Sequence, residues 1–124
     1  MVGYSVSIKE TSRELTAKER VGIKDTTSCI RLDEATKDAK VTIIPSLYCV
    51  LNIHNEKSDD KDYENYIIVD KDGVKYVTGS HSLWSSFMDI ANEMQGEAEE
   101  WGVVVYRVPS KNYKGKDFLT CSII

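Results

Sequence analysis

The spacing of apolar residues changes near Gly79 from a strand period to a helical period. Within residues 41–54, Leu47, Cys49, Leu51 and Ile53 alternate with Tyr48, Val50, Asn52 and His54, a period of two that is typical of a β-strand. After Gly79, apolar residues recur at helical spacing: Leu83, Phe87, Ile90, Ala91 and Met94. We therefore predict a strand over residues 41–54, with a bend or entry point at Pro45, and later a helix that Gly96 can terminate.

The remaining elements follow from β-rich runs separated by polar turns. Asp72-Gly73 is a hairpin signal because both residues tolerate positive φ. Strands are expected on both sides of this turn and again after the helix: 63–70, 74–79, 101–108 and 118–124. The resulting order over residues 40–124 is β-β-β-α-β-β, which is the order of a five-stranded OB barrel. The predicted fold class is mainly β with one helix, an OB-like barrel.

The first 39 residues carry weaker signals. Residues 4–8 and 26–32 read as short strands, and Thr16 with Glu19 forms a capping box that predicts a short helix over 17–23. No linker or repeat separates this segment from the rest. We expect residues 1–39 to be an elaboration on the barrel, within a single domain of residues 1–124.

Bulk composition limits the class of protein. An apolar share of 41% with 29% charged residues fits a folded globule rather than a disordered chain. No apolar run reaches the roughly 18 residues that a membrane span needs, and no secretory signal is visible. The three cysteines are widely spaced in apolar surroundings, which favours reduced thiols. We expect a cytoplasmic protein that does not contact a membrane.

Charge is distributed unevenly. The net charge is −4, and residues 80–108 carry one basic and five acidic side chains. Residues 109–124 carry three lysines and one aspartate, a net +2. The overall sign argues against wrapping by nucleic acid, but a local basic tip remains.

That basic tip is the stretch SKNYKGKDF, in which Lys111, Lys114 and Lys116 surround Tyr113. In an OB barrel the loops joining strands one to two and four to five flank the face that binds oligonucleotides, and here those loops are 55–62 and 109–116. Lysines can neutralise phosphates while the tyrosine ring stacks on a base. The alternative is an exposed turn whose lysines serve solubility, and the sequence leaves both interpretations open.

The stretch SLYCVLNIHNEKSDDKDYENYIIVDKDGVKYVTGS, followed by a helix and SKNYKGKDFLTCSII, resembles the small single-stranded DNA-binding proteins of bacteriophages that infect Gram-positive bacteria. The resemblance implies an OB barrel that coats single-stranded DNA during replication or recombination in the host cytoplasm. It also implies a homo-oligomer that recruits replication or recombination proteins. Two departures from the family leave the recruited partners and the type of oligomer undefined, though not the fold. Bacterial homologues usually end in a flexible acidic tail, whereas this chain ends in Cys121-Ser-Ile-Ile, and the first forty residues have no counterpart in a minimal barrel.

The candidate nucleic-acid-binding residues combine cations with aromatic rings in or beside the predicted strands: Tyr48, His54, Tyr66, Lys75, Arg107, Lys111, Tyr113, Lys114 and Lys116. For any single strand tyrosine, a place at the edge of the core is the alternative. The acidic loop 55–62 opposes the hypothesis, because its carboxylates would repel phosphate.

Two other functions stay open. One is a phage-encoded interaction module, an adaptor or an inhibitor of a host system, that uses an acidic surface around 89–100. The weaker one is a small nucleic-acid-processing enzyme, although neither a nucleophile elbow nor a GxxxxGK motif occurs. Cys49 and His54 do not make a four-ligand zinc site. We expect neither enzymatic activity nor a metal or other cofactor.

Overall fold

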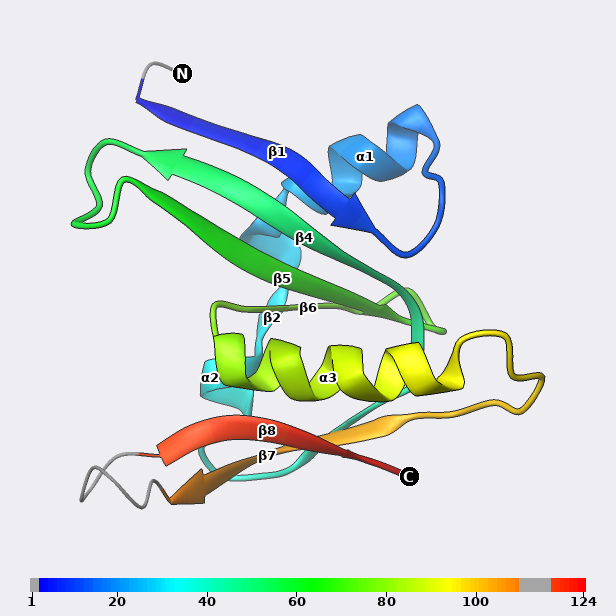
Figure 1. Ribbon diagram of the computed structural model, residues 1–124. Coiled ribbons are helices and arrows are strands. Elements are labelled where there is room, and N and C mark those ends of the chain that lie inside the picture. Colours follow the sequence, from blue (N-terminus) through cyan, green and yellow to red (C-terminus); the bar gives the residue numbers. More distant parts are fainter. Residues whose placement is uncertain (1–2, 110–116) are drawn as a thin grey trace. The chain divides into compact units, whose positions relative to one another are not determined.

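The computed structural model describes residues 3–109 and 117–124, and it confirms a mainly β protein with a long helix between strands (Figure 1). Within these residues the strands form two sheets, one of order β1-β4-β5-β6-β2 and one of order β3-β7-β8. Neither sheet closes on itself in the described part of the chain, so the expected closed barrel is not observed. The chain divides into two compact units, residues up to 30 with 46–79, and residues 31–45 with 80 onward.

The first unit is built on the five-stranded sheet. Its elements are β1 (Tyr4–Thr11), α1 (Ala17–Lys24), a 3-10 turn (Thr26–Ser28), β2 (Ile30–Arg31), β4 (Pro45–Asn55), β5 (Asp62–Asp70) and β6 (Lys75–Thr78). The period-two pattern of β4 is confirmed, because Leu47, Cys49, Leu51 and Ile53 are all buried in one cluster. The other buried members of that cluster are Leu15, Ile23 of α1, Ile67 of β5 and Val77 of β6. One face of the sheet is therefore the core of this unit, and α1 contributes to it.

Local sequence signals account for α1 and for the β5–β6 turn. The Thr16 hydroxyl accepts from the Glu19 amide at 3.2 Å, and the Glu19 carboxylate accepts from the Thr16 amide at 3.0 Å, so the predicted capping box is present. Hydrogen bonds from Arg13 and Thr16 lower the pKa of Glu19 to about 2. In the turn, Gly73 has φ +86, which is the positive φ that its position predicts.

The N-terminal segment differs from expectation. The prediction of a strand over residues 26–32 was wrong. The Asp25 side chain accepts a hydrogen bond from the Thr27 amide at 3.1 Å and starts a 3-10 turn, so only Ile30–Arg31 form a strand, β2. Helix α2 (Leu32–Ala35) follows at once. β1 pairs with β4 and β2 lies beside β6, so the N-terminal segment supplies both outer strands of the five-stranded sheet.

The single strand expected over 41–54 is divided. β3 (Val41–Ile43) pairs with β7 (Val103–Pro109) in the three-stranded sheet, whereas β4 begins at Pro45 in the five-stranded sheet. Pro45 lacks a backbone N–H and suits the first position of a strand. The predicted entry point at Pro45 is therefore confirmed, and the chain changes sheets just before it.

The second unit contains α2, β3, α3 (His81–Met94), β7 and β8 (Asp117–Ile123). The predicted helical stripe is confirmed, because Leu83, Phe87 and Ala91 of α3 are buried. The Ser80 hydroxyl caps α3 by accepting from the Leu83 amide at 3.2 Å, and Gly96 with φ +84 follows its end. The Ser82 hydroxyl donates to the Leu119 carbonyl at 2.9 Å, so α3 lies along β8 (Figure 1).

Candidate nucleic-acid interface

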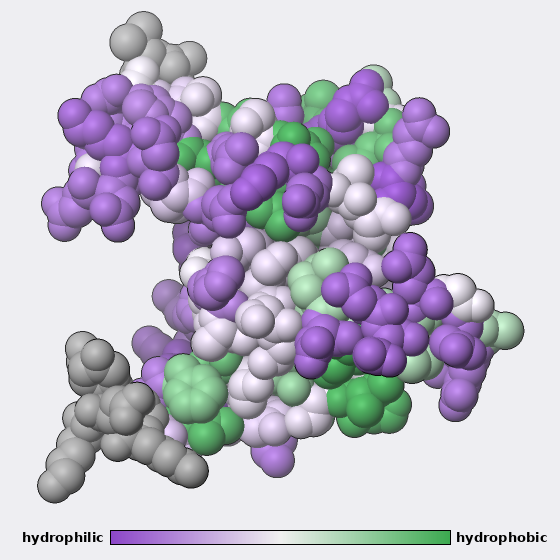
Figure 2. Space-filling model, in the orientation of Figure 1, coloured by the Kyte–Doolittle hydropathy of each residue, from purple (hydrophilic) through white to green (hydrophobic). Residues whose placement is uncertain are grey.

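The β7–β8 hairpin presents two aromatic side chains on one face. In its antiparallel register Tyr106 opposes Thr120 and Val108 opposes Phe118. Opposed residues share a face, so Tyr106 and Phe118 are diagonal neighbours, within reach of each other as aromatic side chains. Phe118 is 41% exposed, and hydrophobic surface is visible at this end of the hairpin in Figure 2. An exposed ring at a hairpin end is a surface on which a nucleic-acid base can stack.

A cation and a hydrogen bond fix the second ring. The Lys40 ammonium lies 5.3 Å from the centroid of the Tyr106 ring, and the Tyr106 hydroxyl is 2.7 Å from that of Ser122. The Lys40 side chain is exposed, so its charge is available to a phosphate next to the rings. Lys40, Tyr106 and Phe118 thus place one positive charge and two aromatic rings together.

The basic segment is attached to this same hairpin. Pro109 and Asp117 are paired at its end, one register step beyond Val108 and Phe118. The chain between them contains the four predicted residues Lys111, Tyr113, Lys114 and Lys116, which lie outside the described residues. In the sequence, three lysines and a tyrosine thus lie between Pro109 and Asp117, the last described pair of the hairpin.

Arg107 is placed differently from expectation. It opposes the buried Leu119 and so occupies the face of the hairpin opposite Phe118. Its guanidinium donates to the Asp33 carbonyl, and its Nε is buried without a partner among the described residues. Arg107 therefore holds the segment around α2 and does not extend the aromatic face.

Three more of the predicted residues belong to the five-stranded sheet, and they do not all lie on one of its faces. Lys75 shares the face of the buried Val77 and donates to the Gly22 carbonyl of α1 at 2.9 Å. Tyr66 lies on the opposite face, is 5% exposed and donates to Glu64 at 3.3 Å. Tyr48 is half-buried, and its backbone N–H donates to the Ser12 hydroxyl at 3.1 Å. Lys75 thus lies on the core face of this sheet, whereas Tyr48 and Tyr66 lie on the other face, so the three residues do not share one face.

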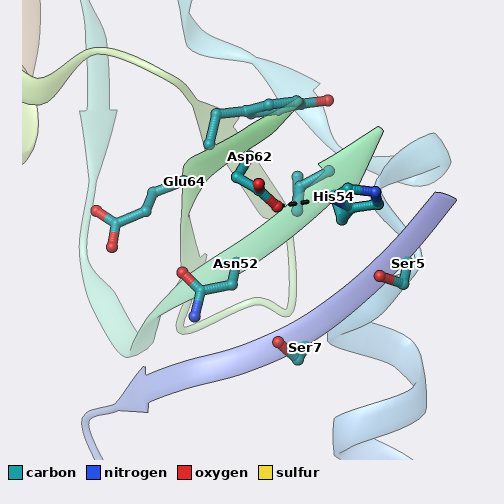
Figure 3. Close-up of a pocket in the computed structure, with 8 residues that line it drawn as sticks. Ser5, Ser7, Asn52, His54, Asp62 and Glu64 are labelled. Carbon is teal, nitrogen blue, oxygen red and sulfur yellow. Dashed lines mark hydrogen bonds and ion pairs between the residues drawn. The ribbon is translucent and has the colours of Figure 1, made fainter. Parts of the chain in front are cut away.

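His54 lies in an open pocket of about 390 Å³ on the same sheet (Figure 3). Ser5 and Ser7 of β1, Asn52 and His54 of β4, and Asp62 and Glu64 of β5 line this pocket. The His54 Nδ1 is 2.7 Å from Asp62, and its Nε2 is 2.7 Å from Glu56. Both neighbours are carboxylates that only accept, so the imidazolium form, with two N–H donors, satisfies the site. His54 is therefore neutralised by acidic groups and is poorly suited to bind phosphate.

The connection between β4 and β5 surrounds this histidine with charge. Lys61 lies 3.4 Å from Glu56, and Asp59 and Asp60 are exposed. The hydrophilic side chains of this connection gather over the left end of β4 and β5 in Figure 2. The acidic character expected of the loop is thus accompanied by a local network of His54, Glu56, Lys61 and Asp62.

The pKa of His54 gives a pH prediction. Hydrogen bonds to Asp62 and then to Glu56 raise this pKa above the ordinary value of 6.5. A raised folded-state pKa means that the contribution of His54 to stability is present below pH 6.5 and is lost as pH rises through the folded pKa. An NMR titration of the His54 ring is expected to show the raised pKa, and Asp62→Asn or Glu56→Gln is expected to lower it. A wild-type pKa at or below 6.5 would contradict the geometry.

Comparisons of the chain with protein-family models, curated proteins and solved structures found no match. None of the helices in residues 3–109 and 117–124 is long and apolar enough to cross a membrane. The residues of this chain alone define the candidate interface.

Sequence reasoning missed Phe118, Tyr106 and Lys40 as site residues. The alternation in FLTCSII contained part of the signal, because Leu119 and Cys121 are buried and Phe118 therefore faces the other way. The neighbourhood of Lys40 and Tyr106 depends on the separate pairing of β3 with β7, which no local pattern shows.

Proposed function

We propose that this protein binds single-stranded DNA without sequence preference through the β7–β8 hairpin. The observation that carries this proposal is the exposed Phe118, on one face with Tyr106 and Lys40, at the end of a hairpin whose connecting segment contains three lysines. Bases stack on the aromatic face, and the lysines neutralise the neighbouring phosphates. Stacking needs unpaired bases, so a single strand is the expected ligand rather than a duplex.

The order of elements supports an OB-like organisation for this function. From β4 onward the chain runs β4, β5, β6, α3, β7 and β8, with the long helix between the third and fourth of these strands. In that organisation the β7–β8 connection corresponds to the strand four to five loop, which contacts oligonucleotides. We propose a role in coating single strands during phage DNA replication or recombination, without catalysis.

The three lysines of the 110–116 segment allow a prediction about how DNA binding depends on salt. Replacing Lys111, Lys114 and Lys116 together with glutamine is expected to weaken binding and to flatten its salt dependence. Each phosphate neutralised on a single strand contributes about 0.7 to the slope of log Kobs against log salt, so the slope should fall by about 2. Fluorescence anisotropy of a labelled single strand, measured over a series of salt concentrations, gives this slope.

A matched control separates the local effect from the change in net charge. Lys18, Lys37 and Lys57 are exposed lysines elsewhere on the chain, and their joint replacement with glutamine removes the same charge. This control variant should keep the wild-type slope. Equal slopes for the wild-type protein and both triple variants would argue against phosphate binding by the 110–116 segment.

A second function is favoured by a different surface. The α3 end and the residues after it carry five exposed carboxylates: Asp89, Glu93, Glu97, Glu99 and Glu100. Such a surface repels phosphate and suits a basic partner protein. An interaction module acting through residues 89–100 predicts that single-stranded DNA is not bound at low salt.

A further inference from the structure

The outer edge of β1 carries backbone groups that point away from the sheet. β1 is at one end of the strand order, and no described strand pairs with its outer side. The Glu56 amide donates to the Gly3 carbonyl at 2.7 Å, so the hydrogen-bonded pairs with β4 occur at Gly3 and then at every second residue. The N–H and C=O groups of Tyr4, Val6 and Ile8 therefore face the open edge.

Residues 4–8 of this edge lack two of the features that usually prevent strand pairing, and α1 is the helix that contacts β1. The segment Tyr4-Ser-Val-Ser-Ile8 contains neither a charge nor a proline, and its composition favours a strand. A register shift between Ile8 and Glu10, with the charged Lys9 and Glu10, ends the regular edge on its C-terminal side. The unpaired edge that a second strand can join is thus five residues long and ends at this register shift.

We propose that this edge binds the same edge of a second copy of the chain, in an antiparallel pair centred on Val6. About Val6 the segment is self-complementary: Tyr4 of one copy opposes Ile8 of the other, and Ser5 opposes Ser7. Because Tyr4, Val6 and Ile8 all have outward backbone groups, the pair contains about six N–H···O bonds. A two-fold interface of this kind uses the same surface on both copies.

Burial supports this register. Tyr4 is 37% exposed, on the same face as the half-buried Val6 and Ile8. Pairing covers Tyr4 with the aliphatic Ile8 of the second copy, an aromatic and β-branched cross-strand pair. Ser5 and Ser7 are exposed on the other face, where their hydroxyls meet without a buried charge. The interface is independent of the DNA-binding proposal, because none of these residues belongs to the β7–β8 hairpin.

The register makes a charge-swap experiment possible on exposed positions. Ser5→Lys with Ser7→Lys places two lysine pairs across the two-fold axis, whereas Ser5→Glu with Ser7→Lys places two glutamate–lysine pairs there. Sedimentation equilibrium over a concentration series reaching the high micromolar range is expected to show a wild-type dimer. The double-lysine variant should raise the dimer dissociation constant by about tenfold, and the glutamate–lysine variant should restore or tighten it.

Val6→Pro tests the backbone pairing directly. The Val6 N–H points to the open edge, so proline removes a donor of the dimer but none of the β1–β4 ladder. Circular dichroism should show a folded protein, and sedimentation should show a monomer. A wild-type protein that stays monomeric throughout the series, or a dimer that neither Val6→Pro nor the double-lysine variant weakens, would overturn the proposal.

Discussion

Replacing Phe118 with alanine is expected to weaken single-stranded DNA binding by about 5- to 150-fold, because a stacked base contributes about 1–3 kcal/mol. Phe118 is 41% exposed at the start of β8, so its loss removes an aromatic face without opening a cavity in the core. The expected effect on the free energy of unfolding is small. Anisotropy titrations of the two proteins at one fixed salt concentration measure the difference in binding.

Phe118→Leu provides the matched control for this experiment. Leucine keeps an apolar side chain of similar reach but has no planar ring for stacking. The leucine variant should therefore lose most of the DNA affinity that the alanine variant loses, whereas Phe118→Tyr should bind DNA as well as the wild-type protein does. If leucine binds as well as phenylalanine, the contact is not a stacking interaction and the assignment of Phe118 is wrong.

The largest effect on stability is expected at Phe87. This side chain is fully buried in α3, with its ring centroid 5.3 Å from that of Trp84 and 6.1 Å from that of Trp101. Phe87→Ala removes these contacts and leaves a cavity, which should lower the free energy of unfolding by about 3–5 kcal/mol. Urea unfolding followed by tryptophan fluorescence is a suitable measurement, because both tryptophans of the chain are next to Phe87.

An exposed apolar residue offers the comparison for Phe87. Val21 is 71% exposed on α1, so Val21→Ala should change the free energy of unfolding by no more than about 0.5 kcal/mol. A loss at Phe87 no larger than the loss at Val21 would show that the α3 core is not packed as described.

Elements with a strong local period were predictable from the sequence. The period of two in β4, the helical stripe of α3, the capping box of Thr16 and the glycine turn at Gly73 are all confirmed. Each depends on residues within a few positions of one another, so the sequence alone contains the signal. The pairing partners of the strands could not be predicted from the sequence in the same way. β1 and β2 join the sheet through contacts with β4 and β6, which are distant in sequence.

The surroundings of the predicted site residues could not be predicted from the sequence, because long side chains have alternative partners. Lys75 and Arg107 are cations in strands, as expected, but each donates to a backbone carbonyl of its own unit. His54 is held between two carboxylates, which the sequence could only suggest as an acidic loop nearby. Phe118 was assigned to a strand, but its exposure depends on which face of the hairpin is covered. The partners and the exposure of these side chains depend on tertiary contacts, which the spacing of residues in the sequence does not reveal.

The acidic loop and the proposed binding site belong to different units of the chain. Its carboxylates surround His54 in the five-stranded sheet, whereas Phe118, Tyr106 and Lys40 belong to the three-stranded sheet and its second unit. The argument against DNA binding that the sequence raised applies to a groove beside residues 55–62.

The most direct test of the proposed function is an anisotropy titration of the wild-type protein with a labelled single strand and with the same sequence as a duplex. A strand of about 30 nucleotides exceeds the footprint of one OB-sized domain. We expect clear binding of the single strand at low salt, much weaker binding of the duplex, and affinity that falls as salt is raised. Flat curves for both ligands at low salt would contradict single-stranded DNA binding and would favour a protein partner for the acidic surface of residues 89–100.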